Sequence, residues 1–274
     1  MNNRHMRIPR CLPVIALIVA WSFATLAQEG AKPFEPVSGQ AGKDVVWVPT
    51  PEGTVERMLD VAKVTPQDYV IDLGSGDGRN VIAAARRGAT AHGVEWNQDM
   101  VDLSKRRAAE AGVTSKAQFV QGDMYAADIS KASVLALFLL PDNMKKLLPN
   151  FLAMKPGTRI VSNTFGFGDE GWEADLTESV PNCTSWCTVV LWIVPANAAG
   201  TWQSAQGPLT LSQKFQKVSG SFGNTPIADG RLRGDELAFN VNDTHYSGRI
   251  NGDVIEGTVT SGGRQQTWRA TRGK

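Results

Sequence analysis

The sequence has little net charge and few cysteine or histidine residues. Its 28 lysines and arginines nearly balance 27 aspartates and glutamates over 274 residues. Because surfaces that bind nucleic acid carry a clear basic excess, we predict no nucleic-acid partner. The three histidines, His5, His92 and His245, are scattered and offer no ligand pair, so we predict no metal site. The shares of hydrophobic residues, 42%, and charged residues, 20%, are typical of a folded globular protein.

Long hydrophobic runs are absent apart from one near the start of the chain. Arg4, Arg7 and Arg10 precede an apolar stretch over residues 11–27 that ends in small residues before a polar segment. This pattern is typical of a secretory signal peptide and predicts a periplasmic or secreted protein. The alternative is an uncleaved anchor in the inner membrane, but Pro13 and the shortness of the run favour cleavage.

The few cysteines fit an exported protein. Cys11 would leave with the signal, and Cys183 and Cys187 would remain close together in one turn. In an oxidising compartment such a pair can form a disulfide. Two small buried thiols are the alternative, and the sequence leaves both open.

The region up to residue 164 predicts an α/β domain behind a tether. Residues 28–46 are rich in glycine, proline, lysine and glutamate, which predicts a flexible tether. From residue 47, segments typical of strands and helices alternate, with Thr50 and Asp142 as predicted helix caps. We predict strands over residues 69–73, 90–95, 117–121, 133–140 and 158–164, with helices between them. This alternation predicts a doubly wound, Rossmann-like sheet with right-handed crossovers.

After residue 164 the alternation stops. Residues 176–180 and 188–194 predict an antiparallel hairpin at one edge of the sheet, joined through the cysteine turn. Residues 195–200 read as a linker. The first domain is therefore expected to span residues 47–196.

The last part of the chain, residues 200–274, predicts an all-β domain. Its short alternating segments are separated by turns rich in glycine, asparagine and aspartate, and residues 230–241 realign with residues 248–259. This repeat predicts a hairpin copied once, with turns at Gly234-Asp235 and Gly252-Asp253. We expect an antiparallel meander or small barrel of about seven or eight strands.

A glycine-rich loop follows the first predicted strand, in the sequence YVIDLGSGDGRN over residues 69–80. Gly74, Gly76 and Gly78 allow a sharp turn and close approach of a ligand to the backbone. A dinucleotide fingerprint needs glycine where Arg79 stands, so that interpretation is weakened, and no P-loop lysine follows. What remains is a glycine loop with Asp72 at the end of its strand.

This loop resembles the first motif of the class I, or seven-β-strand, S-adenosylmethionine-dependent methyltransferases. The resemblance implies that Glu95, at the end of the second strand, binds both ribose hydroxyls, which suits a carboxylate with two accepting oxygens. It also implies that Asp123 and Met124, after the third strand, contact the adenine. Such strand ends converge on one crevice at the carboxyl edge of the sheet.

Within the class, the chain looks most like the small lysine methyltransferases, with a match over residues 47–196. The segment WVPTP over residues 47–51 resembles a V-P-T-P element of that subgroup, which implies that Thr50 lies near the methionine end of the cofactor. Residues 139–142 stand where amide and base methyltransferases have an N-P-P-Y type motif. The absence of that motif also argues against nucleic-acid methylation.

These observations predict an S-adenosylmethionine-dependent methyltransferase whose acceptor, by resemblance, is a protein lysine. No catalytic base is assigned, and Trp96 is also open to a packing role. The alternatives are an exported relict or binding protein that uses the same fold, and a dinucleotide-dependent enzyme. The residues predicted to bind S-adenosylmethionine are Thr50, Asp72, Gly74, Ser75, Gly76, Gly78, Glu95, Trp96, Asp123 and Met124.

Overall fold

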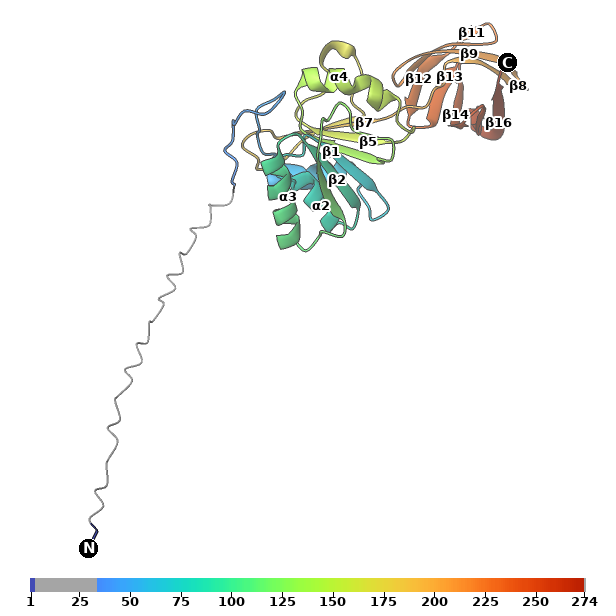
Figure 1. The fold of residues 1–274 in the computed structure, drawn as a ribbon. Coiled ribbons are helices and arrows are strands. Elements are labelled where there is room, and N and C mark those ends of the chain that lie inside the picture. Colours follow the sequence, from blue (N-terminus) through green and yellow to red (C-terminus); the bar gives the residue numbers. More distant parts are fainter. Residues whose placement is uncertain (3–33, 274) are drawn as a thin grey trace. The chain divides into compact units, whose positions relative to one another are not determined.

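The fold is described from a computed structural model, which covers residues 1–2 and 34–273 in detail (Figure 1). Beyond its first two positions, the predicted signal over residues 1–27 lies outside the described residues, and so does the start of the predicted tether. Within the described part, no helix is both long and apolar enough to cross a membrane.

A seven-stranded sheet forms the first part of the described fold (Figure 1). Its strands are β1 (Tyr69–Leu73), β2 (Thr90–Glu95), β3 (Ala117–Gln121), β4 (Val134–Leu137), β5 (Arg159–Asn163), β6 (Leu176–Ser179) and β7 (Thr188–Ile193). The strand order is β3-β2-β1-β4-β5-β7-β6. The first five strands in this order run parallel, whereas β7 is antiparallel to both β5 and β6. The predicted doubly wound sheet with an antiparallel edge hairpin is confirmed.

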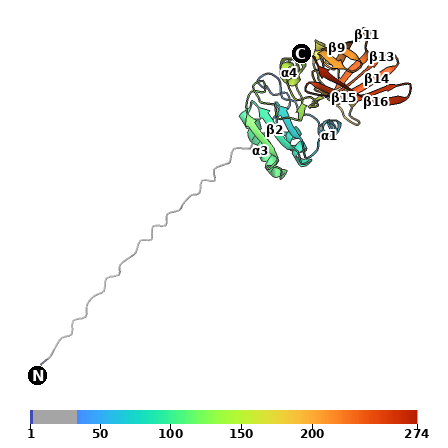
Figure 2. The same cartoon turned by 90° about the vertical axis from the view of Figure 1, so that its right-hand side faces the viewer.

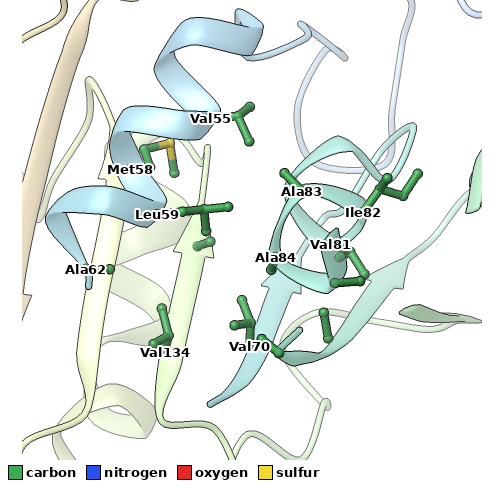
Figure 3. Packing of buried hydrophobic residues seen from close by; sticks show 14 of the residues in the cluster. Val55, Met58, Leu59, Ala62, Val70, Val81, Ile82, Ala83, Ala84 and Val134 are labelled. Atoms are coloured by element: carbon green, nitrogen blue, oxygen red, sulfur yellow. The ribbon is translucent and has the colours of Figure 1, made fainter. Parts of the chain in front are cut away.

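Helices cover both faces of this sheet. They are α1 (Glu52–Val61), α2 (Arg79–Arg86), α3 (Gln98–Glu110) and α4 (Pro141–Leu152), with a short 3-10 helix, η1 (Gly168–Glu170). Successive strand residues point to opposite faces, so Val134 and Ala136 of β4 pack with α1 and α2, whereas Leu135 and Leu137 pack with α4. Figure 3 shows the first of these cores, in which Val134 lies below the side chains of α1. Burial on both faces explains the uninterrupted apolar sequence of this strand.

Two predicted helix caps are wrong. α1 begins at Glu52 with Pro51 at its cap position and no side-chain cap, because Thr50 Oγ1 instead accepts a hydrogen bond from Asn163 Nδ2 at 3.4 Å. α4 begins at Pro141, so Asp142 lies inside its first turn. Proline suits a first helical position since its missing N–H would have no partner there. An acid in the first turn still complements the positive end of the helix.

The second part of the described fold is a closed antiparallel barrel (Figure 2). Its strands are β8 (Gly200–Ser204), β9 (Gly207–Lys214), β10 (Lys217–Phe222), β11 (Thr225–Pro226), β12 (Ala228–Arg233), β13 (Glu236–Val241), β14 (Thr244–Asn251), β15 (Val254–Ser261) and β16 (Arg264–Arg272). They pair in the order β10-β12-β13-β14-β15-β16-β8-β9, and β9 pairs back with β10, while β11 adds to the edge of β10. The prediction of a small barrel is confirmed.

The barrel interior is filled with side chains. Trp202, Phe239, Tyr246 and Trp268 are buried, and the rings of Phe239 and Tyr246 stack with centroids 5.0 Å apart. The two predicted Gly-Asp turns join β12 to β13 and β14 to β15. Their glycines have φ values of +63° and +58°, a left-handed conformation that glycine adopts without a steric penalty.

Residues 195–200 differ from the predicted linker. Ala196 and Ala198 are buried in the barrel core. The Ala198 N–H donates to Gln213 Oε1 at 2.7 Å, and the Ala198 carbonyl accepts from Trp202 Nε1 at 2.8 Å. The segment is packed rather than free because its small side chains fit against the buried indole.

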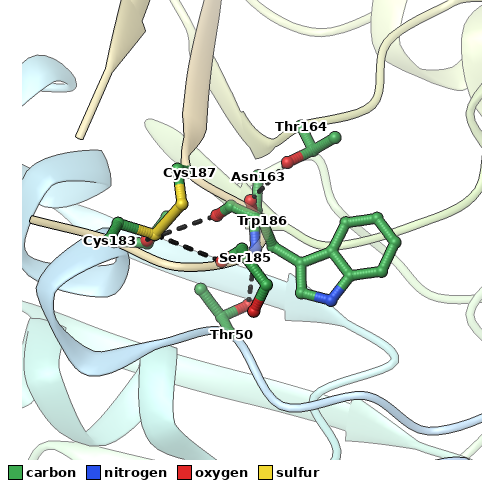
Figure 4. The surroundings of a disulfide bond; sticks show 8 residues. Thr50, Asn163, Thr164, Cys183, Ser185, Trp186 and Cys187 are labelled. Carbon is green, nitrogen blue, oxygen red and sulfur yellow. Dashed lines mark hydrogen bonds between the residues drawn. A yellow bond between two sulfur atoms is a disulfide. The ribbon is translucent and has the colours of Figure 1, made fainter. Parts of the chain in front are cut away.

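Cys183 and Cys187 form a disulfide in the loop between β6 and β7 (Figure 4). Their Cα atoms lie 5.5 Å apart, within the usual range for such a bond. Of the two alternatives for this pair, the structure has the bonded one. The loop that the bond closes carries Trp186.

Candidate active site

A cleft of about 220 Å³ opens at the carboxyl ends of the parallel strands. Asp72 in β1, Glu95 at the end of β2 and Asp123 after β3 all line it. Every residue predicted to bind the cofactor lines this cleft except Gly78. The sheet order explains this convergence, since β3, β2 and β1 are neighbours whose carboxyl ends share one edge.

The glycine loop turns out of β1 through left-handed conformations. Gly74 and Gly76 have φ values of +74° and +53° and line the cleft. A Cβ on Gly76 would lie 2.5 Å from Nε1 of Trp47, so the indole covers this glycine. Gly78 has a different role from the predicted one, because it caps α2 and packs against Phe119. Its missing Cβ makes room for protein rather than for a ligand.

The Glu95 carboxylate is held by backbone N–H groups. Oε2 accepts from Gly76 N at 2.9 Å, and Oε1 accepts from Asn97 N at 2.9 Å. A carboxylate has about four acceptor positions, so each oxygen keeps capacity for one more hydrogen bond. This arrangement suits the two hydroxyls of a ribose.

Asp72 is a buried carboxyl, and its Oδ2 accepts from Asn80 Nδ2 at 3.1 Å. Burial raises the pKa of Asp72 well above its ordinary value, and the charges of Glu95 and Asp77 act in the same direction, against the hydrogen bond from Asn80. Two other buried atoms at the cleft, Ser75 Oγ and Asn80 Oδ1, have no hydrogen-bond partner among the described residues. Buried polar atoms normally have partners, so these two are exceptions, and Ser75 Oγ lies against Gly93.

Asp77 connects the glycine loop to two arginines. Its carboxylate is almost fully buried and accepts from Arg79 Nε at 2.9 Å, with a further ion pair to Arg107. Burial would raise the pKa of Asp77, but the hydrogen bond from Arg79 and the charges of both arginines hold it below its ordinary value. Arg79 also donates to the Thr50 carbonyl at 2.6 Å. Arg79 therefore links the glycine loop, through Asp77, to the backbone at Thr50 on the other side of the cleft.

The segment before Trp47 lies along the cleft, which departs from the predicted flexible tether over residues 28–46. Trp47 N donates to the Gln40 carbonyl at 2.9 Å, and residues 40–46 line the cleft. Lys43 Nζ pairs with Asp123 Oδ2 at 2.7 Å and lies 4.2 Å from the ring centroid of Trp96. These contacts order a segment that has no apolar periodicity of its own.

The side of the cleft beyond β4 contains residues that sequence reasoning missed. Asn163 ends β5 and is fully buried, so it does not itself line the cleft, but it donates to the lining residue Thr50 and accepts from Thr164 Oγ1 at 2.9 Å. Three aromatic residues, Phe138, Phe165 and Trp186, also line the cleft. A tryptophan between two cysteines was a visible signal for one of them. Phe138, Phe165 and Asn163 had no such signal, because the residues that they contact come from distant parts of the chain.

The described residues fit S-adenosylmethionine. The glycine turn lets the cofactor approach the protein backbone, and the free acceptor positions of Glu95 suit its ribose. Asp123 would need to release Lys43 to accept from an adenine amine. The structure thus brings all of the predicted residues except Gly78 together in one cleft.

The chain is similar in sequence to known methyltransferases. A family model, the ANTKMT methyltransferase domain, matches residues 72–175. The chain is 39% identical over 153 residues to a protein-lysine N-methyltransferase of Saccharolobus islandicus, a match that covers 55% of this chain and 94% of that protein. It is 30% identical over 159 residues to the adenine nucleotide translocase lysine N-methyltransferase of Mus musculus, with 53% of this chain and 69% of the mouse protein covered.

A solved structure is also similar. It is described as an RNA methyltransferase from Salinibacter ruber in complex with S-adenosyl-L-homocysteine. The match has a TM-score of 0.51 and 44% sequence identity, and it covers 55% of this chain and 95% of the other.

The fold, the glycine loop and the acidic strand ends together define a class I S-adenosylmethionine-dependent methyltransferase. Within that class, the chain belongs to the family of lysine N-methyltransferases that includes the Saccharolobus islandicus protein. None of these matches favours a dinucleotide-dependent enzyme.

Proposed function

We propose that this enzyme methylates the side-chain amine of lysine in a protein, and that it acts after export from the cytosol. The names of the Saccharolobus islandicus and mouse relatives support a lysine acceptor. The charge of the cleft is the observation on this chain that carries the proposal.

The cleft is rich in acidic groups. Among the described residues that line it, five are acidic and two are basic: Asp44, Asp72, Asp77, Glu95 and Asp123 against Lys43 and Arg79. Both basic residues are paired, Lys43 with Asp123 and Arg79 with Asp77. Burial raises the pKa of Asp72, and Asp77 and Asp123 are paired, so Asp44 and Glu95 are the described lining carboxylates without a basic partner. This smaller acidic excess still favours a cationic acceptor over a phosphate backbone. This argues for lysine over RNA, although the Salinibacter ruber neighbour is described as an RNA methyltransferase.

S-adenosylmethionine supplies an electrophilic methyl group when bound. The residues of this chain have to orient the acceptor in line with that group and keep water out. A lysine amine must lose its proton before it can attack, and burial in the cleft lowers the pKa of an amine. Thr50 lines this side of the cleft, and its Oγ1, which accepts from Asn163, is a polar group that can orient the neutral amine.

The acceptor class is tested by methyl transfer from isotopically labelled S-adenosylmethionine. The substrates are an extract of envelope proteins and an RNA fraction from the same cells, each treated separately. We expect label in protein, and mass spectrometry of digests should locate it on lysine. Label in RNA alone would contradict the proposal.

Export is supported by the basic and apolar segment over residues 4–27 and by the disulfide, since such bonds persist in oxidising compartments. We expect intact-mass measurement of the native protein to give an N-terminus near Gln28, with Cys183 and Cys187 bonded. Treatment with a thiol reductant should then add the mass of two hydrogens. An N-terminus at Met1 with free thiols would instead mean an enzyme anchored in the inner membrane and facing the cytosol.

A further inference from the structure

Three aromatic rings form one cluster at the cleft. The ring centroids of Phe138 and Phe165 lie 6.0 Å apart, and those of Trp186 lie 5.5 Å from Phe138 and 5.6 Å from Phe165. All three residues line the cleft and remain partly accessible. We call Phe138, Phe165 and Trp186 the aromatic cluster. Its residues come from three chain segments, so only the folded sheet brings them together.

The aromatic cluster lies on the side of the cleft away from the predicted ribose and adenine groups. Phe138 follows β4 and Phe165 follows β5, whereas Glu95 and Asp123 follow β2 and β3. In the sheet, β1 separates these two pairs of strands. The cleft therefore has two sides, and the aromatic cluster is on the side away from Glu95 and Asp123, where Thr50, predicted near the methionine end, also lies.

Trp186 is held in place from two directions. The disulfide closes the loop around it, and its own φ of +56° is a left-handed conformation that non-glycine residues rarely adopt. Thr54 Oγ1 of α1 also donates to the Trp186 carbonyl at 3.3 Å. Figure 4 shows the indole extending from this loop, away from the disulfide. A large apolar ring that stays 37% exposed under such constraints is poised for a ligand.

The chemistry of this side of the cleft matches an alkylammonium group. Aromatic faces attract cations, including methylated amines, and the nearby acidic groups add a long-range attraction. The rings also offer apolar surface to the methylene groups of a long side chain. A phosphate or carboxylate acceptor would find no free cation among the described lining residues.

We propose that the aromatic cluster binds the side chain of the target lysine, and that the Cys183–Cys187 disulfide positions Trp186 for this role. The proposal rests on the proposed lysine acceptor and adds the place where that lysine binds. Phe138, Phe165 and Trp186 contact the methylene chain and first bind the cationic end of the side chain. The ammonium group then loses its proton to water, and the neutral amine attacks the methyl group.

A binding experiment that needs no turnover tests this site. The protein is labelled with 5-fluorotryptophan, saturated with S-adenosylhomocysteine and titrated with Nα-acetyl-lysine methylamide. Trp186→Phe identifies the resonance of Trp186 by its loss. We expect that resonance to shift more with the lysine probe than with the neutral Nα-acetyl-norleucine methylamide, which keeps the methylene chain but lacks the ammonium group. An equal shift with both probes, or no shift at Trp186, would overturn the proposal.

Variants give a second readout. Trp186→Ala should raise the dissociation constant of the lysine probe about tenfold, as loss of a cation–π contact predicts, and Trp186→Phe should raise it less. The double variant Cys183→Ser/Cys187→Ser, which keeps the indole but frees its loop, should also weaken the probe. Leu152→Ala, an exposed apolar residue on α4, is the matched control and should change nothing.

The dissociation constant of S-adenosylhomocysteine separates this proposal from the proposed function. Calorimetry should give the same value for the wild type, Trp186→Ala and the double cysteine variant. Unchanged binding of the lysine probe in both variants, with lysine methylation intact, would overturn the acceptor site alone. Methylation of RNA rather than lysine would overturn the proposed function, and the acceptor site with it.

Discussion

Asp77→Asn is expected to lower the free energy of unfolding by about 3 kcal/mol. Removing one partner of a buried ion pair typically costs 3–5 kcal/mol, and the lower end applies because Arg79 and Arg107 keep partial access to water. The asparagine keeps the shape of the side chain but leaves two arginines without their shared carboxylate. Urea unfolding at neutral pH measures the difference.

A surface ion pair provides the matched control. Asp60 pairs with Arg87 at 2.7 Å, but its side chain is 54% exposed. Exposed pairs contribute about 0–1 kcal/mol, so Asp60→Asn should change the stability by less than Asp77→Asn does. Equal losses in the two variants would contradict the structural role of Asp77.

The same pair predicts a pH dependence. The folded-state pKa of Asp77 is lowered, so its contribution to stability is present above the ordinary aspartate value of about 4. That contribution is lost as the pH falls through the lower, folded-state value. The stability difference between wild type and Asp77→Asn should therefore shrink below about pH 4. A difference that grows on acidification would mean that the carboxyl is not held as an ion.

Much of the first domain could be predicted because its signals are local. The apolar run of β4 and the glycines that end the helices depend on neighbouring residues only, and the predicted strands agree with the observed ones within a few residues. The repeated Gly-Asp turns were equally visible, since hairpin turns require particular residues. These signals sufficed for the doubly wound sheet and for the barrel.

The incorrect or missing assignments depend on residues far apart in the chain. Thr50 is a good helix cap by local chemistry, but Asn163 competes for its hydroxyl from the end of β5. The sequence of residues 195–200 resembles a linker, but in the fold their alanines pack with the buried Trp202. No local pattern indicates that a ring after β4, another after β5 and a third in a disulfide loop will meet.

Asp77 shows the same limit inside a recognised motif. It stands between two glycines of the loop, but the sequence predicted a role only for the glycines and for Ser75. Its partner Arg107 lies in α3, and the pairing depends on how that helix packs beside the loop. The sequence thus predicted the position of the cofactor residues, but not the ion pairs that hold the glycine loop in place.

Glu95→Ala is expected to weaken binding of S-adenosylmethionine and S-adenosylhomocysteine by about 1–3 kcal/mol. The variant loses two charge-assisted hydrogen bonds to the ribose hydroxyls. This corresponds to a rise of roughly fivefold to 150-fold in the dissociation constant. Calorimetry of the purified protein measures both ligands directly, without knowledge of the acceptor.

Glu95→Gln separates the ribose contact from the structural role of this side chain. Glu95 also accepts from Gly76 N and Asn97 N, so alanine leaves two backbone donors without partners. Glutamine has the same shape as glutamate and keeps one accepting oxygen. The affinity of Glu95→Gln for the cofactor should therefore fall between those of the wild type and Glu95→Ala. Glu110→Ala, an exposed acid at the end of α3, is the control and should bind like wild type. Unchanged affinity in Glu95→Ala would remove Glu95 from the cofactor site. If both Glu95 variants lose cofactor affinity and also lose a similar free energy of unfolding, the main role of Glu95 is to hold the glycine loop.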